Sequence, residues 1–140
     1  MKFNIKSYSS AGPIKFGMRQ SEVRDLLGTN YKSFKRTPAS EYPCDYFKSL
    51  GVFVYYKNPG VVEAIEFAVP AEPIFESENL LNLSYEDLLV FFQMKDANLE
   101  IEPDSLISFL FGISAYTPNA DENPQLPAES IIAFGNGYYD

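Results

Sequence analysis

An internal repeat limits the folds open to this chain more than any other feature. DLL at 25–27 returns at 87–89, GVFVYYKN at 51–58 is matched by GISAYTPN at 112–119, and AIEF at 64–67 is matched by IIAF at 131–134. The three offsets are 62, 61 and 67 residues, and the increase of six residues to the last offset falls in the turn of the second unit, which is longer than that of the first. Because order and spacing are kept, the repeat predicts two tandem units, each a helix followed by an antiparallel sheet.

The length of the chain sets how these units can be stabilised. At 140 residues it has the size of one ordinary domain. Units of about 60 residues share one core or one continuous sheet more readily than they fold alone. We therefore expect an α+β fold of two tandem helix-plus-antiparallel-sheet units in a single domain, residues 1–140, with unit 1 at about 12–69 and unit 2 at about 73–136.

Two stretches have the pattern of short helices. The first lies within GMRQSEVRDLLG (17–28), where Gly28 suits the left-handed position that ends a helix. Its apolar face, at i, i+3 and i+4, holds Val23, Leu26 and Leu27. The second helix is expected over 83–95, with Ser84 as N-cap. A phosphate-binding loop would need more glycines and a following Lys-Ser/Thr, so we interpret the first motif as structural.

The clearest strands form a hairpin of 45–58 and 60–69, joined by a type II turn at Asn58-Pro59-Gly60-Val61. Side chains alternate along a strand, so this register divides the hairpin into two faces. The mostly apolar face, expected to pack on the helices, holds Val52, Val54, Tyr56, Glu63, Ile65 and Phe67. The opposite face mixes rings with charges and holds Phe53, Tyr55, Lys57, Ala64 and Glu66. The repeat carries the mixed face into unit 2 through Ser114, Tyr116 and Ala133.

The remaining strands are less clearly marked. YKSFKR (31–36) indicates a short basic strand, 99–119 one or two strands, and 128–136 a last strand. The segments TPASEYP (37–43) and ADENPQLP (120–127) are rich in turn residues and are expected to be loops.

The chain contains no histidine, which restricts its chemistry more than any other property of its composition. Without histidine the chain lacks the usual general base near neutral pH, Ser-His and Cys-His nucleophile pairs, and most zinc sites. The single cysteine, Cys44, cannot form an intrachain disulfide and fits a small buried residue. We expect a protein that is not an enzyme and that uses no cofactor or metal. The lone cysteine and a start, MKFNIKSYSS, without the apolar core of a signal peptide favour the cytoplasm.

Charge is divided unevenly along the chain. Residues 1–70 carry ten Lys/Arg and six Asp/Glu, a net of +4, whereas residues 71–140 carry one base, Lys95, and 13 acids, a net of −12. A surface this acidic repels nucleic acid and anionic lipid and attracts basic proteins. The longest fully apolar run, 88–92, is too short to span a membrane. The expected partner is a basic protein, with no role for nucleic acid or membrane.

Four acids of the second half lie close together in the sequence: Asp96, Glu100, Glu102 and Asp104. Glu100 and Glu102 share one face of a strand, and the other two flank them. The group matches no metal-loop spacing, and acids along a strand are usually solvated charges that discourage edge-to-edge aggregation. The functional alternative is an electrostatic landing site for a basic partner.

Two strings of the first half carry a resemblance to known families. GPIKFGMRQSEVRDLLG, followed by GVFVYYKNPGVVEAIEF, resembles small cytoplasmic immunity proteins of bacterial polymorphic, contact-dependent toxin systems. The portion GM-x-x-x-EV-x-x-LLG, Gly17 to Gly28, is also similar to the helix-start motif of SmpA/OmlA-type lipoproteins. Those lipoproteins are similar in fold to the β-lactamase inhibitor protein, itself a tandem repeat of helices and antiparallel sheet. The chain lacks the lipid-accepting N-terminal cysteine of the lipoproteins and the disulfides of secreted inhibitors, and the resemblance implies no catalytic residues.

These observations favour a binding protein over an enzyme. Aromatic rings beside a few polar groups are typical of a protein-binding patch. The candidate partner-binding residues are Phe53, Tyr55, Glu66, Glu100, Glu102, Ser114 and Tyr116. Our hypothesis is an immunity-type protein that neutralises a cognate toxin by covering its active or substrate-binding surface.

Two other functions stay open: a small ligand-binding protein or carboxylate/Tyr-based enzyme with a cleft between the units, and a structural adaptor. The binding hypothesis requires that the mixed face is open. The alternative is that Phe53 and Tyr55 cover a second small core.

Overall fold

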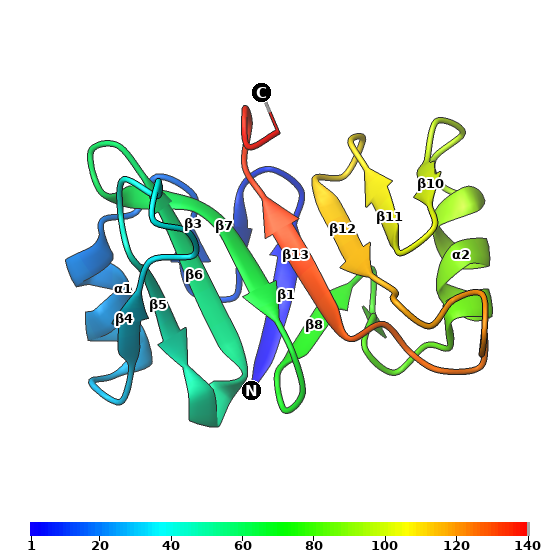
Figure 1. Ribbon diagram of the computed structural model, residues 1–140, viewed down its shortest axis with the longest axis horizontal. Helices are drawn as coiled ribbons and strands as arrows, with labels where there is room; N and C mark the ends of the chain where they lie inside the picture. Colours follow the sequence, from blue (N-terminus) through cyan, green and yellow to red (C-terminus); the bar gives the residue numbers. More distant parts are fainter. Residues whose placement is uncertain (140) are drawn as a thin grey trace.

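A computed structural model describes residues 1–139 and has the expected α+β architecture. An eight-stranded antiparallel sheet forms one layer, and two helices with a smaller five-stranded sheet form the other (Figure 1). The elements in chain order are β1 (Lys2–Lys6), β2 (Ser10–Ala11), β3 (Ile14–Lys15), α1 (Gln20–Leu27), β4 (Lys32–Phe34), β5 (Cys44–Phe47), β6 (Val52–Lys57), β7 (Val61–Phe67), β8 (Glu72–Phe75), β9 (Glu78–Asn79), α2 (Tyr85–Gln93), β10 (Glu100–Glu102), β11 (Ser105–Ser108), β12 (Ile113–Tyr116) and β13 (Ser130–Phe134).

The two predicted units lie end to end in the large sheet. Its strand order is β10-β11-β12-β13-β7-β6-β5-β4, so each unit contributes one helix and four consecutive strands. The units meet where β13 pairs with β7, antiparallel, with Ile131 opposite Phe67 and Phe134 opposite Ala64. The prediction of a continuous sheet is therefore confirmed. α1 and α2 lie toward the two opposite ends of this sheet (Figure 1).

The smaller sheet ties the beginning of the chain to the beginning of unit 2. Its order is β3-β2-β1-β8-β9, and β1 runs parallel to β8, with Phe3 opposite Pro73. It lies behind the centre of the large sheet in Figure 1. One core cluster fills the space between the layers and includes residues of both units, among them Phe3, Val23, Phe67, Leu88 and Ile131.

Each unit builds its middle strands around the same tight turn, which the sequence prediction missed. Residues 45–58 form two strands rather than one, because a single 3-10 turn at Lys48–Leu50 separates β5 from β6. The turn ends at Gly51, whose φ of 71° is left-handed and whose added Cβ would lie 2.1 Å from the carbonyl oxygen of Ala68. Gly112, with φ 66°, occupies the same position between β11 and β12. Residues 99–119 accordingly hold three strands, β10, β11 and β12.

The turn between β6 and β7 differs from the predicted type II turn. The N–H of Gly60 donates to the carbonyl oxygen of Lys57 at 2.6 Å, and the Asn58–Pro59 peptide bond is cis. Pro59 is therefore the third residue of a type VI turn. The predicted positive φ of Gly60 is confirmed, at 97°.

A β-bulge changes the predicted register of this hairpin near the turn. The pairs Val52–Phe67 and Val54–Ile65 form as predicted, but the register shifts between Tyr55 and Tyr56, and Tyr56 pairs with Val62. The bulge places Glu63 among the residues of a hollow beside Tyr55, so its assignment to the helix-facing side was wrong.

The assignment of Ala133 to the mixed face was also wrong. Val52 pairs with Phe67 and Ile113 with Ala133, so β6 and β12 are 61 residues apart but β7 and β13 are 66 apart. The sequence repeat assigned 67, and a slip of one residue moves every side chain of a strand to the other face. Ala133 is buried in the main core, and its neighbour Ile132 lies on the opposite side.

The helices begin and end close to the predicted positions. Ser84 caps α2, and its hydroxyl accepts a hydrogen bond from the N–H of Asp87 at 3.1 Å. Gly28 follows α1 with a positive φ of 99°. The predicted apolar face of α1 is only partly correct, since Val23 is buried and Leu27 packs on the core but Leu26 is 49% exposed.

A buried carboxylate joins α1 to the large sheet. Asp45 on β5 is fully buried and receives two hydrogen bonds from Arg24, at 2.9 and 3.0 Å. The hydroxyls of Ser33 and Tyr56 also donate to it, at 2.5 and 2.9 Å. Burial alone would raise the pKa of Asp45, but hydrogen bonds from Arg24 and the two hydroxyls hold it below the ordinary value.

Candidate functional site

All seven candidate residues lie on the face of the large sheet opposite the main core, which we call the outer face. Residues paired directly across strands share a face, so the register can be followed from strand to strand. One such row runs through Tyr46, Phe53, Glu66, Ile132, Ser114, Ile107 and Glu100. A second row of unit 2 runs through Ser130, Tyr116, Ser105 and Glu102. Tyr55 lies two residues after Phe53 on β6 and shares its face.

The unit 1 end of the outer face is covered at Tyr55 by other parts of the chain. Tyr55 is only 6% exposed, and the guanidinium carbon of Arg36 lies 3.8 Å from its ring centroid. Burial, followed by the hydrogen bond that Tyr55 donates to Glu66, raises the pKa of Tyr55. Cys44, Ala64 and Phe134 complete a small second core beneath this cover. The ring of Tyr55 is thus unavailable to a partner while Arg36 stays in place.

Phe53 belongs to an aromatic stack at the same end of the sheet. Its ring stacks on Tyr46 with centroids 4.1 Å apart and meets Phe34 edge-on at 6.4 Å. Phe53 is half-buried, whereas Phe34 on the edge strand β4 is exposed. The stack fixes these rings in place and leaves an apolar edge open to solvent.

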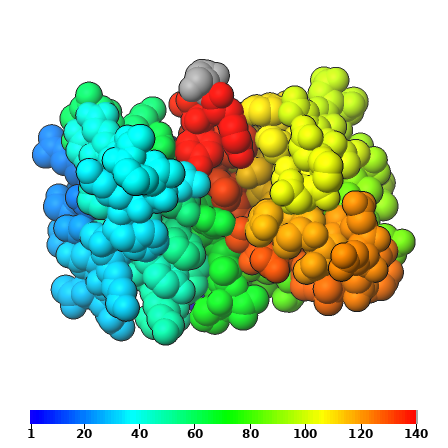
Figure 2. Space-filling model, in the orientation of Figure 1, coloured from blue at the N-terminus to red at the C-terminus, as the bar shows by residue number. Residues whose placement is uncertain are grey.

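The two tyrosines near the end of the chain lie against the middle of the outer face. Tyr138 accepts a hydrogen bond from Arg36 at 3.0 Å, and Tyr139 donates one to the hydroxyl of Ser114 at 3.3 Å. Ser114 is 6% exposed as a result. In Figure 2 the C-terminal residues, in red, lie between the cyan segment that carries Arg36 and the yellow strands of unit 2. Asp140 lies outside the described residues.

A hollow of about 220 Å³ opens between this cover and unit 2, and we call it the central hollow. It is lined by Arg36, Glu66, Ser105, Ile107, Ser114, Ala115, Tyr116, Ile132 and Tyr139. One oxygen of Glu66 accepts from Tyr55 and the other from Ser130, at 2.6 Å for Ser130. The carboxylate is therefore held in one orientation. Tyr116 is 45% exposed at the side of the hollow.

The acidic edge of the sheet is only partly what the sequence predicts. Glu100, Glu102 and Asp104 are exposed at or beside β10, in reach of a partner. Asp96 is buried instead, where it accepts hydrogen bonds from the hydroxyl of Ser108 at 2.8 Å and the N–H of Asn98 at 2.9 Å. The suggestion that Asp96 belongs to a landing site was wrong, because this carboxylate fastens the segment after α2 to β11.

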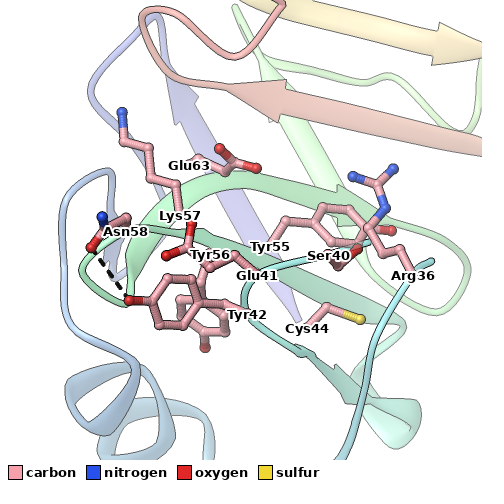
Figure 3. Close-up of a pocket in the computed structure, with 10 residues that line it drawn as sticks. All are labelled: Arg36, Ser40, Glu41, Tyr42, Cys44, Tyr55, Tyr56, Lys57, Asn58 and Glu63. Atoms are coloured by element: carbon pink, nitrogen blue, oxygen red, sulfur yellow. Dashed lines mark hydrogen bonds between the residues drawn. The ribbon is translucent and has the colours of Figure 1, made fainter. Parts of the chain in front are cut away.

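A second hollow, of about 230 Å³, lies on the other side of Arg36 (Figure 3). Tyr42 closes one end of it and donates a weak hydrogen bond to Asn58 at 3.4 Å. Glu63 lies opposite with Lys57, and burial raises the pKa of this carboxyl, against the opposing effect of Lys57.

Sequence reasoning missed six residues that line the central hollow: Arg36, Ser105, Ile107, Ala115, Ile132 and Tyr139. Ser105, Ile107 and Ile132 become identifiable once the strand register is known, because they pair across strands with candidate residues. Arg36 and Tyr139 reach the site from a connector and from the end of the chain, and no local pattern marks such contacts.

Residues 1–139 show no sign of a metal site or of a membrane-spanning helix. No group of three or more His, Cys, Asp or Glu side chains is arranged to hold a metal ion. No helix within this part of the chain is long and apolar enough to cross a membrane.

The chain was also compared with known proteins. No protein-family model, no curated protein and no solved structure matches it.

Proposed function

We propose that this chain is an immunity-type inhibitor that binds a cognate basic protein toxin through the open, acidic part of its outer face. The observation that carries the proposal is the contrast between the two ends of that face. At the unit 1 end Arg36 and Tyr138 cover Tyr55, and the edge left open there, at Phe34, is apolar. The unit 2 end instead leaves Tyr116, Glu100 and Glu102 exposed. An exposed ring flanked by carboxylates is the composition of a protein-binding patch for a basic partner.

Net charge supports the same partner. The second half carries a net of −12, and its one basic residue, Lys95, pairs with Glu76 at 2.8 Å. Enzymes that act on nucleic acid expose basic surfaces to bind phosphate, so an acidic face of this kind would speed association and block access to substrate. The lone cysteine, Cys44, is buried and forms no disulfide bond, in keeping with action in the cytoplasm.

The ligand-binding or enzymatic alternative has less support. The central hollow lies between the units, but at about 220 Å³ it is smaller than the roughly 300–1,000 Å³ of most ligand sites. A larger hollow of about 510 Å³ lies at the other end of the unit junction, with Val69 and Leu126 exposed in it and Glu129 as its one carboxylate. Neither hollow brings together two acids of unlike environment, which acid–base catalysis by carboxylates would need.

The first experiment tests protection directly. The reading frame next to the one that encodes this chain is expressed in a bacterial host, with and without the chain. We expect growth arrest by the neighbouring product alone and recovery when the chain is present. A toxic neighbour that the chain does not neutralise would contradict the proposal.

The second experiment tests the surface, by binding kinetics with the purified toxin. Glu100→Lys with Glu102→Lys should slow association by about tenfold at low salt and weaken its salt dependence. The matched control, Glu76→Lys with Glu78→Lys, makes the same charge change at the turn between β8 and β9 and should slow association much less.

Tyr116→Ala should chiefly speed dissociation, because a ring at an interface acts through contacts made after docking. Wild-type kinetics in all these variants would exclude the proposed surface.

A further inference from the structure

Tyrosines at equivalent positions of the two units differ in their exposure to solvent. Tyr55 lies four residues after Gly51 and Tyr116 four residues after Gly112, and both glycines end the tight turn before their strand with a left-handed φ. Both rings are on the outer face. Tyr55 is 6% exposed and Tyr116 is 45% exposed.

An arginine is part of this difference. In unit 1 the guanidinium of Arg36 lies on the ring of Tyr55 and donates to the hydroxyl of Tyr138. Residues 71–140 contain no arginine, and their single lysine, Lys95, pairs with Glu76 and lies 4.7 Å from the ring centroid of Phe91. Unit 2 therefore has no cation of its own to place on Tyr116.

The central hollow beside Tyr116 has the groups that a guanidinium needs. The Glu66 carboxylate is held by Tyr55 and Ser130, and each of its oxygens keeps capacity for a further donor. Tyr116 and Tyr139 supply two exposed rings at the sides. Glu102 lies two strands, about 10 Å, from Tyr116 and adds negative potential at the rim. A planar guanidinium can stack face to face on a ring while its N–H groups donate in the same plane to a carboxylate, whereas an ammonium has no plane to stack.

We propose that the central hollow receives an arginine side chain of the basic partner, which stacks on Tyr116 and donates to Glu66 as Arg36 stacks on Tyr55. This inference rests on the proposed function, because the partner that supplies the arginine is the toxin. Arg36 already contacts Tyr55 and Tyr138, so it occupies the unit 1 side of the hollow and the incoming group takes the Tyr116 side.

The test is an NMR titration of the isotopically labelled chain with N-acetyl-argininamide. We expect saturable binding in the millimolar range, with the largest amide shifts at Ser105, Ser114, Tyr116 and Ser130. N-acetyl-citrullinamide, which has nearly the same shape without the charge, should not bind at the same concentrations. N-acetyl-lysinamide should bind several-fold more weakly, because it carries the charge without the plane.

Two variants measure separately what the Glu66 carboxylate and the Tyr116 ring contribute to binding. Glu66→Gln should raise the dissociation constant of the arginine probe at least about fivefold, and Tyr116→Leu about threefold. Glu78→Gln, which removes a charge from the smaller sheet, is the matched control and should leave binding unchanged. Equal binding of the arginine and citrulline probes, or shifts confined to the Glu100–Glu102 edge, would overturn the inference even if a variant failed to fold.

The result is separable from that of the protection experiment. Protection against the toxin without arginine binding in the hollow would refute the docking inference alone. Arginine binding at Tyr116 without protection would refute the immunity function and leave a guanidinium-binding site.

Discussion

Replacing Arg24 with methionine would leave the Asp45 carboxylate buried without its cation. The substitution keeps most of the apolar stem of Arg24. It removes the hydrogen bonds to Asp45 at 2.9 and 3.0 Å and to Ser33 at 2.9 Å, together with the contact of the guanidinium with the Tyr31 ring. Removing one partner of a buried ion pair costs about 3–5 kcal/mol. The lower end applies, because the Arg24 side chain is 30% exposed and Ser33 and Tyr56 still donate to Asp45. We expect a loss of about 3 kcal/mol in the free energy of unfolding.

The assay is urea unfolding at pH 7 followed by circular dichroism, together with thermal melting. A loss of about 3 kcal/mol corresponds to a fall of roughly 10 °C in the melting temperature of a domain of this size. Asp45→Asn and the double variant complete a cycle, and the double variant should lose less than the sum of the single ones. A cost below about 0.5 kcal/mol for Arg24→Met, or strict additivity in the cycle, would refute the claim that the two side chains stabilise each other.

Three further predictions follow from burial and backbone geometry. The pKa of Asp45 is lower in the folded protein than the unfolded pKa of about 3.9, so its charge stabilises the fold above about pH 3.9. This stabilisation is lost as the pH falls through the folded pKa. Asp45→Asn should therefore flatten the fall in stability at acid pH, measured by urea unfolding from pH 7 to pH 2. Gly51→Ala should lower the free energy of unfolding by several kcal/mol, because its Cβ would lie 2.1 Å from a carbonyl oxygen. Gly17→Ala, which has a positive φ but open space around it, should cost about 1 kcal/mol. Equal losses for the two variants in urea unfolding would contradict this. Leu88→Ala, at a fully buried position of α2, should cost about 2–5 kcal/mol, and Val90→Ala on its exposed side less than about 0.5, by the same measurement.

The tandem architecture was predictable because both units repeat the same local signals. The glycines at 51 and 112, the strands that follow them and the two DLL helices kept their order, and order is enough to assign topology. The details that failed depend on single residues. Ala133 was assigned to the wrong face because the repeat offset was taken as 67 in place of 66, and Glu63 was assigned wrongly because a bulge follows Tyr55.

The candidate site was predictable only in part. Alternation along the strands placed Phe53, Glu66 and Tyr116 on one face, because that pattern is local. The cover over Tyr55 was not predictable, since it requires Arg36 to meet Tyr138 across 102 residues. The network around Asp45 escaped notice for a similar reason, because its partners come from α1, β4 and β6.

The place of β13 at the centre of the large sheet has a consequence for biosynthesis. β13 is the last strand of the sheet to leave the ribosome, and until then β7 exposes an open inner edge and β12 another. Unpaired edges of this kind promote aggregation, and pairings over 60 residues and more form slowly. A nascent chain halted before residue 130 would expose two such edges at once. Chaperones that bind exposed strands should therefore bind it during translation and release it once β13 has joined the sheet.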